Sequence, residues 1–367
     1  MKRRNFLTAS AAAAGAAALP GCNARSPYDS EAPKKKPMRM HVGTQHWRVT
    51  PMNLQYIKRH GIDHIACWPD DVNDGTMADD FSRARELVEK HGLHLDVVAP
   101  PLLHRAPVAA IMLGKDPDRD REIEYMHNLI QACAESGIPA FKYNLRVLFG
   151  VRTGRTPGRG GSMYSTWKFE QVKDDPPEPE VGELDADTFW ERITYFLDRV
   201  IPVCNEYKIR AMCHPHDPGV PPSGYKGVDR VLGTVEGLKK LVSIQDSPYH
   251  GLNLCLGTTG EMLQDPAREL PDVVRYFGER KKIFNIHFRN IRGKRDDFIE
   301  VWQDEGDMNM IELAKVLYEV DYPYMLMPDH MPLHSDDPGQ LQGFAWGYGY
   351  IKGVLQAVEY LVSPSAS

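Results

Sequence analysis

The chain has 367 residues, of which 42% are hydrophobic and 26% are charged. This composition is typical of one large folded domain or two smaller ones. The net charge is −6 and the sequence has no long run of Lys and Arg, so it lacks the basic surface that nucleic-acid binding requires. We therefore expect no nucleic-acid partner.

The first 22 residues have the pattern of an export signal. Lys2-Arg3-Arg4 precedes a short stretch rich in Ala, which ends at Leu19-Pro20-Gly21-Cys22. This pattern predicts a twin-arginine signal peptide over residues 1–22 with a sequence similar to a lipobox, and hence a periplasmic or membrane-anchored protein. The sequence leaves open whether Cys22 is lipidated and tethers the chain to a membrane, or whether cleavage releases a soluble product. Residues 23–38, rich in Ser, Pro and Lys, are the predicted flexible linker.

From residue 39 onward, short apolar runs alternate with helical patterns. Strands are expected at 39–44, 63–69, 94–99, 140–145, 209–214, 252–256, 283–289 and 324–328. Helices are expected at 52–60, 79–91, 119–136, 187–207, 234–242, 267–278, 307–320 and 343–361. Strand–helix units in this number and order predict an α/β fold, a (β/α)8 TIM barrel, over residues 39–362.

Local signals refine these elements. Asp187 is the expected N-cap of the fourth helix, and Gly61, Gly92 and Gly137 are placed to end earlier helices. The longest connection, residues 149–185, follows the fourth strand and is rich in Gly, Pro and acidic residues. A loop of this length beside the catalytic rim of a barrel predicts a lid.

Four residues able to bind a metal ion stand at or near the ends of consecutive strand candidates: His214, Cys255, His287 and Asp329. One such residue alone is most often structural. In a closed parallel barrel, however, the carboxyl ends of the strands meet at one rim, where active sites lie. The pattern therefore predicts a metal centre made of these four side chains.

Several segments resemble consecutive motifs of the mannonate dehydratase family, whose members are xylose-isomerase-like barrels. The resemblance covers about residues 140–360 and is carried by Lys142-Tyr143-Asn144, Arg152-Thr153, Cys213-His214-Pro215-His216-Asp217-Pro218, Gly251-Leu252-Asn253-Leu254-Cys255, Ile286-His287-Phe288-Arg289-Asn290, Phe298-Ile299-Glu300, Gly306-Asp307-Met308 and Pro328-Asp329-His330. It implies a hydro-lyase that converts D-mannonate to 2-keto-3-deoxy-D-gluconate by removing the C2 proton and eliminating the C3 hydroxyl as water.

The resemblance also implies a cofactor and roles for individual residues. The family's manganese ligands fall on His214, Cys255, His287 and Asp329, although a donor set with one thiolate also accepts iron, zinc or cobalt. Catalytic roles are expected for His330, Arg289 and Tyr348, and substrate contacts for Asn144, Arg152, His216, Asp217 and Trp47. Of these, Trp47 is placed only by its position after the first strand.

The chain departs from the family pattern at four positions close to these motifs. His216 replaces the first Asp of His-Pro-Asp-Asp-Pro, Met327 replaces the Arg before Pro-Asp-His, Met331 replaces the Gly after it, and Gln303 replaces a His. Loss of that Arg favours an alternative, an exported metal-dependent isomerase, epimerase or lyase of the same barrel group acting on a neutral sugar. A third hypothesis is a non-catalytic sugar-binding lipoprotein. A homo-oligomer is compatible with each of them.

Overall fold

The computed structural model describes residues 36–67, 77–104, 107–220 and 224–363. Eight parallel strands close a barrel in the order β1-β12-β9-β8-β7-β4-β3-β2. Their bounds are β1 His41–Thr44, β2 His64–Cys67, β3 His94–Val98, β4 Ala140–Asn144, β7 Arg210–His214, β8 His250–Cys255, β9 Ile283–His287 and β12 Met325–Met327. The predicted (β/α)8 barrel is confirmed, and each predicted strand overlaps an observed one.

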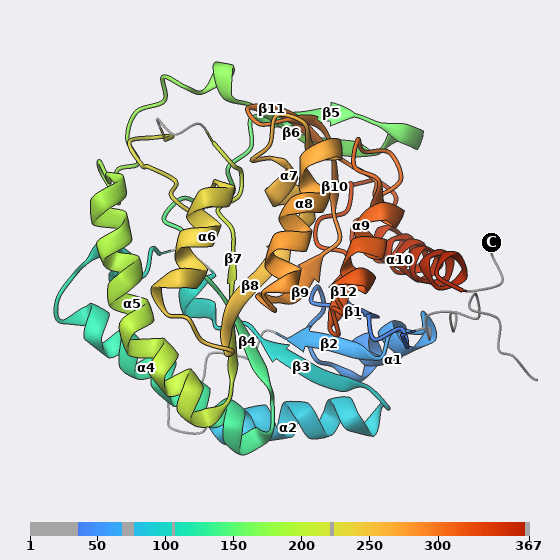
Figure 1. Cartoon of the computed structure of the whole chain (residues 1–367), viewed down its shortest axis with the longest axis horizontal. Coiled ribbons are helices and arrows are strands. Elements are labelled where there is room, and N and C mark those ends of the chain that lie inside the picture. Colours follow the sequence, from blue (N-terminus) through green and yellow to red (C-terminus); the bar gives the residue numbers. More distant parts are fainter. Residues whose placement is uncertain (1–35, 68–76, 105–106, 221–223, 364–367) are drawn as a thin grey trace, which may run out of the picture.

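Helices surround the barrel, as Figure 1 shows. The main ones are α1 Pro51–Arg59, α2 Met77–Lys90, α4 Asp118–Ser136, α5 Ala186–Tyr207, α6 Val235–Ile244, α8 Pro266–Glu279, α9 Met310–Glu319 and α10 Leu341–Leu361. Each overlaps a predicted helix. The sequence did not predict the short helices α3 Ala110–Leu113 and α7 Leu256–Gly260, nor the single-turn helices Pro101–Leu103, Arg159–Gly161 and Phe169–Gln171.

The ends of the helices follow from local chemistry. The side chains of Thr50 and Thr234 accept hydrogen bonds from backbone N–H groups in the first turns of α1 and α6. The N-cap of α5 is Asp185 and not Asp187, because the helix begins one residue earlier than predicted. Gly137 ends α4 in the left-handed conformation, with φ of 70°, which a residue without a Cβ adopts at little cost.

Side chains along each strand point alternately into the barrel and outward to the surrounding helices. One cluster inside the barrel comprises Ala66, Val97, Ala140, Met212, Phe284, Met325 and Met327, and the larger core lies between the strands and the helices. Side chains two residues apart share a face of a strand. His214 and Asp329 therefore continue the interior rows begun by Met212 and Met327, one layer nearer the carboxyl ends.

A second sheet, which the sequence did not predict, lies across one end of the barrel, at the top of Figure 1. Its order is β10-β11-β6-β5, with bounds β5 Gly154–Pro157, β6 Met163–Lys168, β10 Asn290–Lys294 and β11 Asp297–Val301. The segment 149–185, predicted to be a lid-like loop, therefore contributes two strands. They pair through β6 with β11, where Phe298 lies opposite Trp167, and both side chains are buried.

The predicted signal peptide, residues 1–22, lies outside the described residues, as does the linker up to residue 35. Within the described part of the chain, we find no helix with the length and apolar character needed to cross a membrane.

Candidate metal centre

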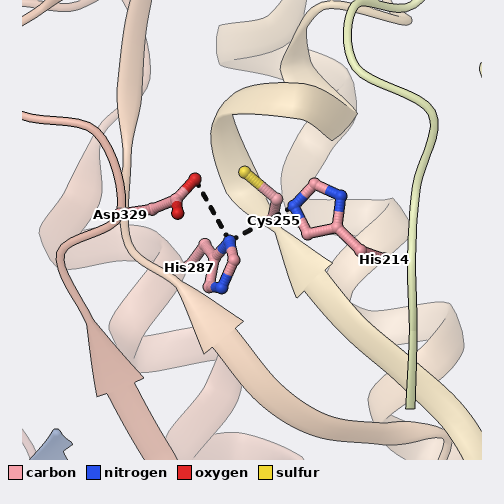
Figure 2. Close-up of side chains that lie close together, drawn as sticks. All are labelled: His214, Cys255, His287 and Asp329. Carbon is pink, nitrogen blue, oxygen red and sulfur yellow. Dashed lines mark hydrogen bonds and ion pairs between the residues drawn. The ribbon is translucent and has the colours of Figure 1, made fainter. Parts of the chain in front are cut away.

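The four predicted metal ligands meet at the carboxyl ends of the barrel strands. His214, Cys255 and His287 are the last residues of β7, β8 and β9, and Asp329 follows β12 by two residues. One donor atom from each side chain lies within 4.8 Å of the others. His287 Nδ1 is 3.2 Å from both His214 Nε2 and Asp329 Oδ2 (Figure 2). The convergence predicted from strand position is therefore present in the structure.

Neighbouring groups hold each imidazole with one ring nitrogen toward the centre of this cluster. His214 Nδ1 donates to the carbonyl oxygen of Pro215 at 2.7 Å, which leaves Nε2 as the acceptor nitrogen. His287 Nε2 lies 3.2 Å from Gln45 Oε1 and 3.1 Å from Asn253 Nδ2, and these two amides fix the ring with Nδ1 toward the cluster. Such hydrogen bonds from the distal nitrogen are typical of histidines that bind metal ions.

The charge states of the four side chains suit a divalent cation. Burial lowers the pKa of His214 to about 4, so its imidazole is neutral. Burial opposes ionisation of Cys255, but Arg289 and His287 outweigh it and lower the pKa of the thiol. Burial likewise opposes ionisation of Asp329, yet His287 and His330 hold its pKa well below the usual value. The neutral imidazole of His214, the imidazole of His287, a thiol biased to thiolate and a carboxylate are a fitting ligand set.

A cavity of about 490 Å³ opens directly over this cluster. His214, His287 and Asp329 belong to its lining, and four cationic side chains, Lys142, Arg146, Arg152 and Arg155, also line it. The volume lies within the range of small-molecule sites. The cavity therefore combines a metal-binding cluster with positive charge able to hold an anionic group.

Arg146 is a cavity residue that the sequence analysis missed. Its Nη2 donates to the carbonyl oxygen of His104 at 2.5 Å, and its guanidinium lies 4.7 Å from the centre of the Phe149 ring. Among the described residues, Arg146 forms no ion pair, and its buried Nε has no hydrogen-bond partner. Its strand-end position just after β4 was the available signal, but no motif marked it.

Gln45 and Lys142 form a polar bridge behind the metal-binding cluster. Gln45 Nε2 donates to Asp329 Oδ1 at 2.8 Å, and Gln45 Oε1 accepts from Lys142 Nζ at 2.5 Å. Burial of the Lys142 ammonium lowers its pKa to about 8. Gln45 follows β1 directly, so its position at a strand end was the signal in the sequence.

His330 stands at the mouth of the cavity, with 47% of its side chain exposed. Its Nδ1 donates to Glu300 of β11 at 3.1 Å, and its Nε2 lies 3.6 Å from Asp329 Oδ2. Burial opposes protonation of His330, but Asp329 and Glu300 outweigh it and raise its pKa to about 9. The second sheet thus orients the histidine that the sequence predicted as catalytic.

Arg289 is placed differently from what was predicted. It is 1% exposed and is not part of the cavity lining, because it sits behind Cys255 in a network of buried charges. Its guanidinium contacts Glu261 at 2.8 Å, Glu300 at 2.6 Å and Asp217 at 3.1 Å, and its Nη2 is 3.5 Å from Cys255 Sγ. Arg289 therefore stabilises the thiolate and the surrounding carboxylates without lining the cavity.

The predicted substrate contacts divide into two groups. Asn144, Arg152 and Asp217 line the cavity, and Arg152 pairs with Asp217 Oδ1 at 2.7 Å and with Glu300. His216 does not line it, because its Nε2 bonds to the carbonyl oxygen of Leu145 at 3.0 Å and its ring packs on Phe189.

Trp47 and Tyr348 also lie away from the lining. Trp47 Nε1 donates to the Tyr348 hydroxyl at 3.0 Å, and that hydroxyl is hydrogen-bonded to Thr44 at 2.6 Å. Tyr348 is completely buried. His46, the residue before Trp47, lines the cavity in its place.

The structure also locates the remaining departures from the family pattern. Met327 is completely buried inside the barrel, where its sulfur lies 3.7 Å from Asn285 Nδ2, one layer below Asp329. Gln303 is buried and donates to the carbonyl oxygen of Phe288, whereas Met331 lines the cavity. The absence of Arg at position 327 does not leave the site without a cation, because Lys142, Arg146 and Arg152 line the cavity. It therefore gives no support to a neutral substrate.

Comparison with known proteins gives a consistent result. The model of the D-mannonate dehydratase (UxuA) family matches residues 179–363. The mannonate dehydratase of Thermotoga neapolitana is 28% identical over 358 residues, which cover 86% of this chain and 96% of that protein. Mannonate dehydratase 2 of Halalkalibacterium halodurans is 28% identical over 302 residues, covering 74% of this chain and 84% of that protein.

Solved structures agree. The mannonate dehydratase of Streptococcus suis serotype 2 superposes with a TM-score of 0.75 at 25% identity, covering 88% of this chain and 95% of that chain. A xylose isomerase domain protein of Planctomyces limnophilus, at 10% identity and a TM-score of 0.54 over 88% of this chain and 98% of that chain, shares the fold. With half of its length matched by the family model, the chain belongs to the D-mannonate dehydratase family of hydro-lyases.

Proposed function

We propose that this chain is a metal-dependent sugar-acid dehydratase that converts D-mannonate to 2-keto-3-deoxy-D-gluconate. One observation carries the proposal: His214, Cys255, His287 and Asp329 converge at the base of a cavity that also presents cationic side chains. A sugar acid offers both a carboxylate for the cations and hydroxyls for a metal ion. Family membership supports the same substrate class.

The four converging side chains would hold a divalent ion, for which we propose Mn²⁺, with Fe²⁺, Zn²⁺ and Co²⁺ as alternatives that this donor set accepts. When bound, the ion supplies Lewis acidity, which makes the C2 proton easier to remove and stabilises the negative charge that develops on the acid group. Around it, Gln45 fixes both Asp329 and His287 through hydrogen bonds.

We assign binding of the substrate carboxylate to Arg146. The guanidinium carries a positive charge on the cavity wall, and within the described residues it forms no ion pair. Arg152 is less suited, because it is already paired with Asp217 and Glu300. A planar guanidinium can bind a carboxylate through two parallel hydrogen bonds, and this geometry is stronger than a single contact.

Elimination of water from the sugar acid needs two proton transfers. A base takes the proton from C2, the electron pair forms the C2–C3 double bond, and the C3 hydroxyl leaves as water after it receives a proton. We assign these transfers to His330 and Lys142, which both line the cavity. Lys142, whose pKa is lowered to about 8, acts as the base in its neutral amine form, and protonated His330, whose pKa is raised to about 9, donates the proton to the C3 hydroxyl. Glu300 fixes the ring of His330, and Gln45 fixes the amino group of Lys142. The resulting enol rearranges to the 2-keto acid.

We also propose that the chain is exported by the twin-arginine route. The support is the sequence pattern over residues 1–22, which lies outside the described residues. This route carries folded proteins, so a metal ion bound in the cytoplasm would stay with the site. Cell fractionation of wild type, of an Arg3→Lys, Arg4→Lys variant and of Cys22→Ser tests export and lipid attachment separately.

The decisive experiment is an assay of the purified, Mn²⁺-loaded protein with D-mannonate, following 2-keto-3-deoxy-D-gluconate. We expect turnover that is lost in His330→Ala, with the metal content unchanged. Absence of turnover while the metal is bound would contradict D-mannonate as substrate. The protein would then be assayed with neutral sugars for isomerase or epimerase activity. Binding of sugars without any turnover would instead support the non-catalytic hypothesis.

A further inference from the structure

The opposite rim of the barrel carries a second group of metal-binding side chains. β1, β2 and β3 each begin with a histidine, namely His41, His64 and His94. Because parallel strands start at the same end of a barrel, these residues lie at the rim away from the cavity. Donor atoms of His41, His64 and Asp96 lie within 4.8 Å of one another. The proposed dehydratase site uses none of these residues.

Local backbone geometry brings Asp96 into this group. The pairing of β2 with β3 shifts between Ile65 opposite Leu95 and Ala66 opposite Val97, so Asp96 is an extra residue at a β-bulge. A bulge redirects a side chain that regular pairing would place elsewhere. Here Asp96 Oδ2 lies 2.6 Å from His64 Nδ1 and 3.8 Å from His41 Nε2.

One ring nitrogen of His41, Nε2, has no hydrogen-bond donor opposite it among the described residues. His41 Nδ1 lies 3.2 Å from the carbonyl oxygen of Arg39, which can only accept, so Nδ1 carries the proton. In the neutral ring, Nε2 then presents a lone pair toward the Asp96 carboxylate. His41 Nε2 is buried and has no hydrogen-bond partner among the described residues. Two facing acceptors need a cation between them, either a proton or a metal ion.

The spacing of the three donors fits a small divalent ion. Bonds of about 2.0–2.1 Å to nitrogen and oxygen place the ligand atoms of a tetrahedral site roughly 3.3 Å apart. The two distances from Asp96 Oδ2, 2.6 and 3.8 Å, lie on either side of that value. The rings of His41 and His64 are already stacked, with centres 3.6 Å apart. Only small side-chain movements are required.

Exposure and charge also suit a metal ion bound from solution. The side chains of His41, His64 and Asp96 are 28%, 25% and 26% exposed, so an ion can enter and keep water as a further ligand. Burial opposes ionisation of Asp96, but the adjacent rings of His41 and His64 lower its pKa to about 2, so a carboxylate is present at neutral pH.

We propose that His41, His64 and Asp96 form a second divalent-metal site, selective for ions that favour imidazole, such as Zn²⁺. An ion bound there joins β1, β2 and β3 at the rim where barrel residues serve stability more than catalysis. Because the ion binds the folded state, it raises the melting temperature, and the rise increases with the concentration of the free ion. The role is structural and independent of the proposed dehydratase activity.

The test is a Zn²⁺ titration of the full chain, purified without a polyhistidine tag, with bound metal counted by elemental analysis. Wild type should bind two equivalents. A Cys255→Ser, Asp329→Ala variant should bind one, and adding Asp96→Asn to it should remove that one. His127→Ala, a histidine outside both clusters, is the matched control and should change nothing. Circular dichroism checks that each variant is folded.

Co²⁺ provides a second readout that separates the two sites. A thiolate ligand gives a near-ultraviolet charge-transfer band, so binding at Cys255 is visible there, whereas a site with two imidazoles and a carboxylate gives only weak visible bands. We expect the Cys255→Ser, Asp329→Ala variant to show only the weak bands, and to gain a few degrees in melting temperature with Zn²⁺. No bound equivalent in this variant, or an equivalent that survives Asp96→Asn, would overturn the proposal.

Discussion

The barrel rim and the four-stranded sheet make different contributions to the candidate active site. The rim supplies the four converging donors, which are fixed at or beside strand ends by the pairing of β7, β8, β9 and β12. The sheet supplies Glu300, which orients His330, and its β5 and β6 contribute Arg155 and Ser165 to the cavity wall. The barrel strands thus provide the proposed metal-binding residues, and the segments inserted between strands and helices orient the reacting groups.

The largest loss of activity is expected when a metal-binding side chain at the barrel rim is removed. His214→Ala or Asp329→Ala should remove the bound ion and lower kcat/KM by at least about 1,000-fold, since several kcal/mol of charge stabilisation are lost. Metal content and activity are measured on the same samples. Asp187→Ala, an exposed residue at the start of α5, is the control. A His214→Ala protein that keeps a full equivalent at this site would contradict the ligand assignment.

A smaller loss of activity is expected from substitutions of His330 and Glu300, which lie where the second sheet meets the barrel rim. His330→Ala should lower kcat by about 100- to 10,000-fold, as loss of a proton-transfer group does. Glu300→Gln keeps the shape of the side chain but weakens the hold on His330, so we expect about a 10- to 100-fold loss. Steady-state kinetics with metal content as a check measure both. Equal losses in the two variants would mean that Glu300 does more than position His330.

The cavity wall should affect binding more than turnover. Arg146→Leu should raise KM for D-mannonate by about 10- to 100-fold with a smaller change in kcat, because an ionic contact to the carboxylate is lost. Arg146→Lys should restore part of the affinity. Arg159→Leu is the matched control, since Arg159 pairs with Asp304 and does not line the cavity. An unchanged KM in Arg146→Leu would remove its assigned role.

The smallest effect is expected at a residue that the sequence predicted to be catalytic. Tyr348→Phe removes a hydroxyl bonded to Thr44 and Trp47, outside the cavity lining. We expect kcat to change by less than about threefold, and stability to fall by about 2 kcal/mol, because two hydrogen bonds of about 1 kcal/mol each are lost. Denaturant unfolding and kinetics measure these quantities. A 100-fold loss of kcat would return Tyr348 to the catalytic set.

The same contrast explains what the sequence could predict. Barrel strands are short, apolar and separated by helical patterns, so each is visible locally, and position at strand ends was enough to identify His214, Cys255, His287 and Asp329. The second sheet pairs β6 with β11, about 130 residues apart, through strands with polar faces. Periodicity within one segment carries no information about such pairing, so the segment looked like a loop.

The position of individual side chains relative to the cavity could not be predicted, for a related reason. Arg289, His216 and Tyr348 belong to matching motifs or suitable positions, but whether a side chain faces the cavity depends on neighbours from other elements, such as Glu261 and Phe189. Arg146 was missed because its role depends on the lack of a carboxylate partner among the described residues, a property of three-dimensional surroundings. Motif matching located the site and could not assign every role within it.

The pairing of β6 with β11 has an evolutionary consequence. Loops above a barrel usually vary independently, and this freedom lets one scaffold acquire many substrates. Here the insertion after β4 and the hairpin after β9 form one sheet, with Trp167 opposite Phe298. An insertion or deletion in either strand would shift the register and turn the buried faces outward. The two segments must therefore diverge together, so substrate range in this lineage should change by side-chain replacement more readily than by loop length.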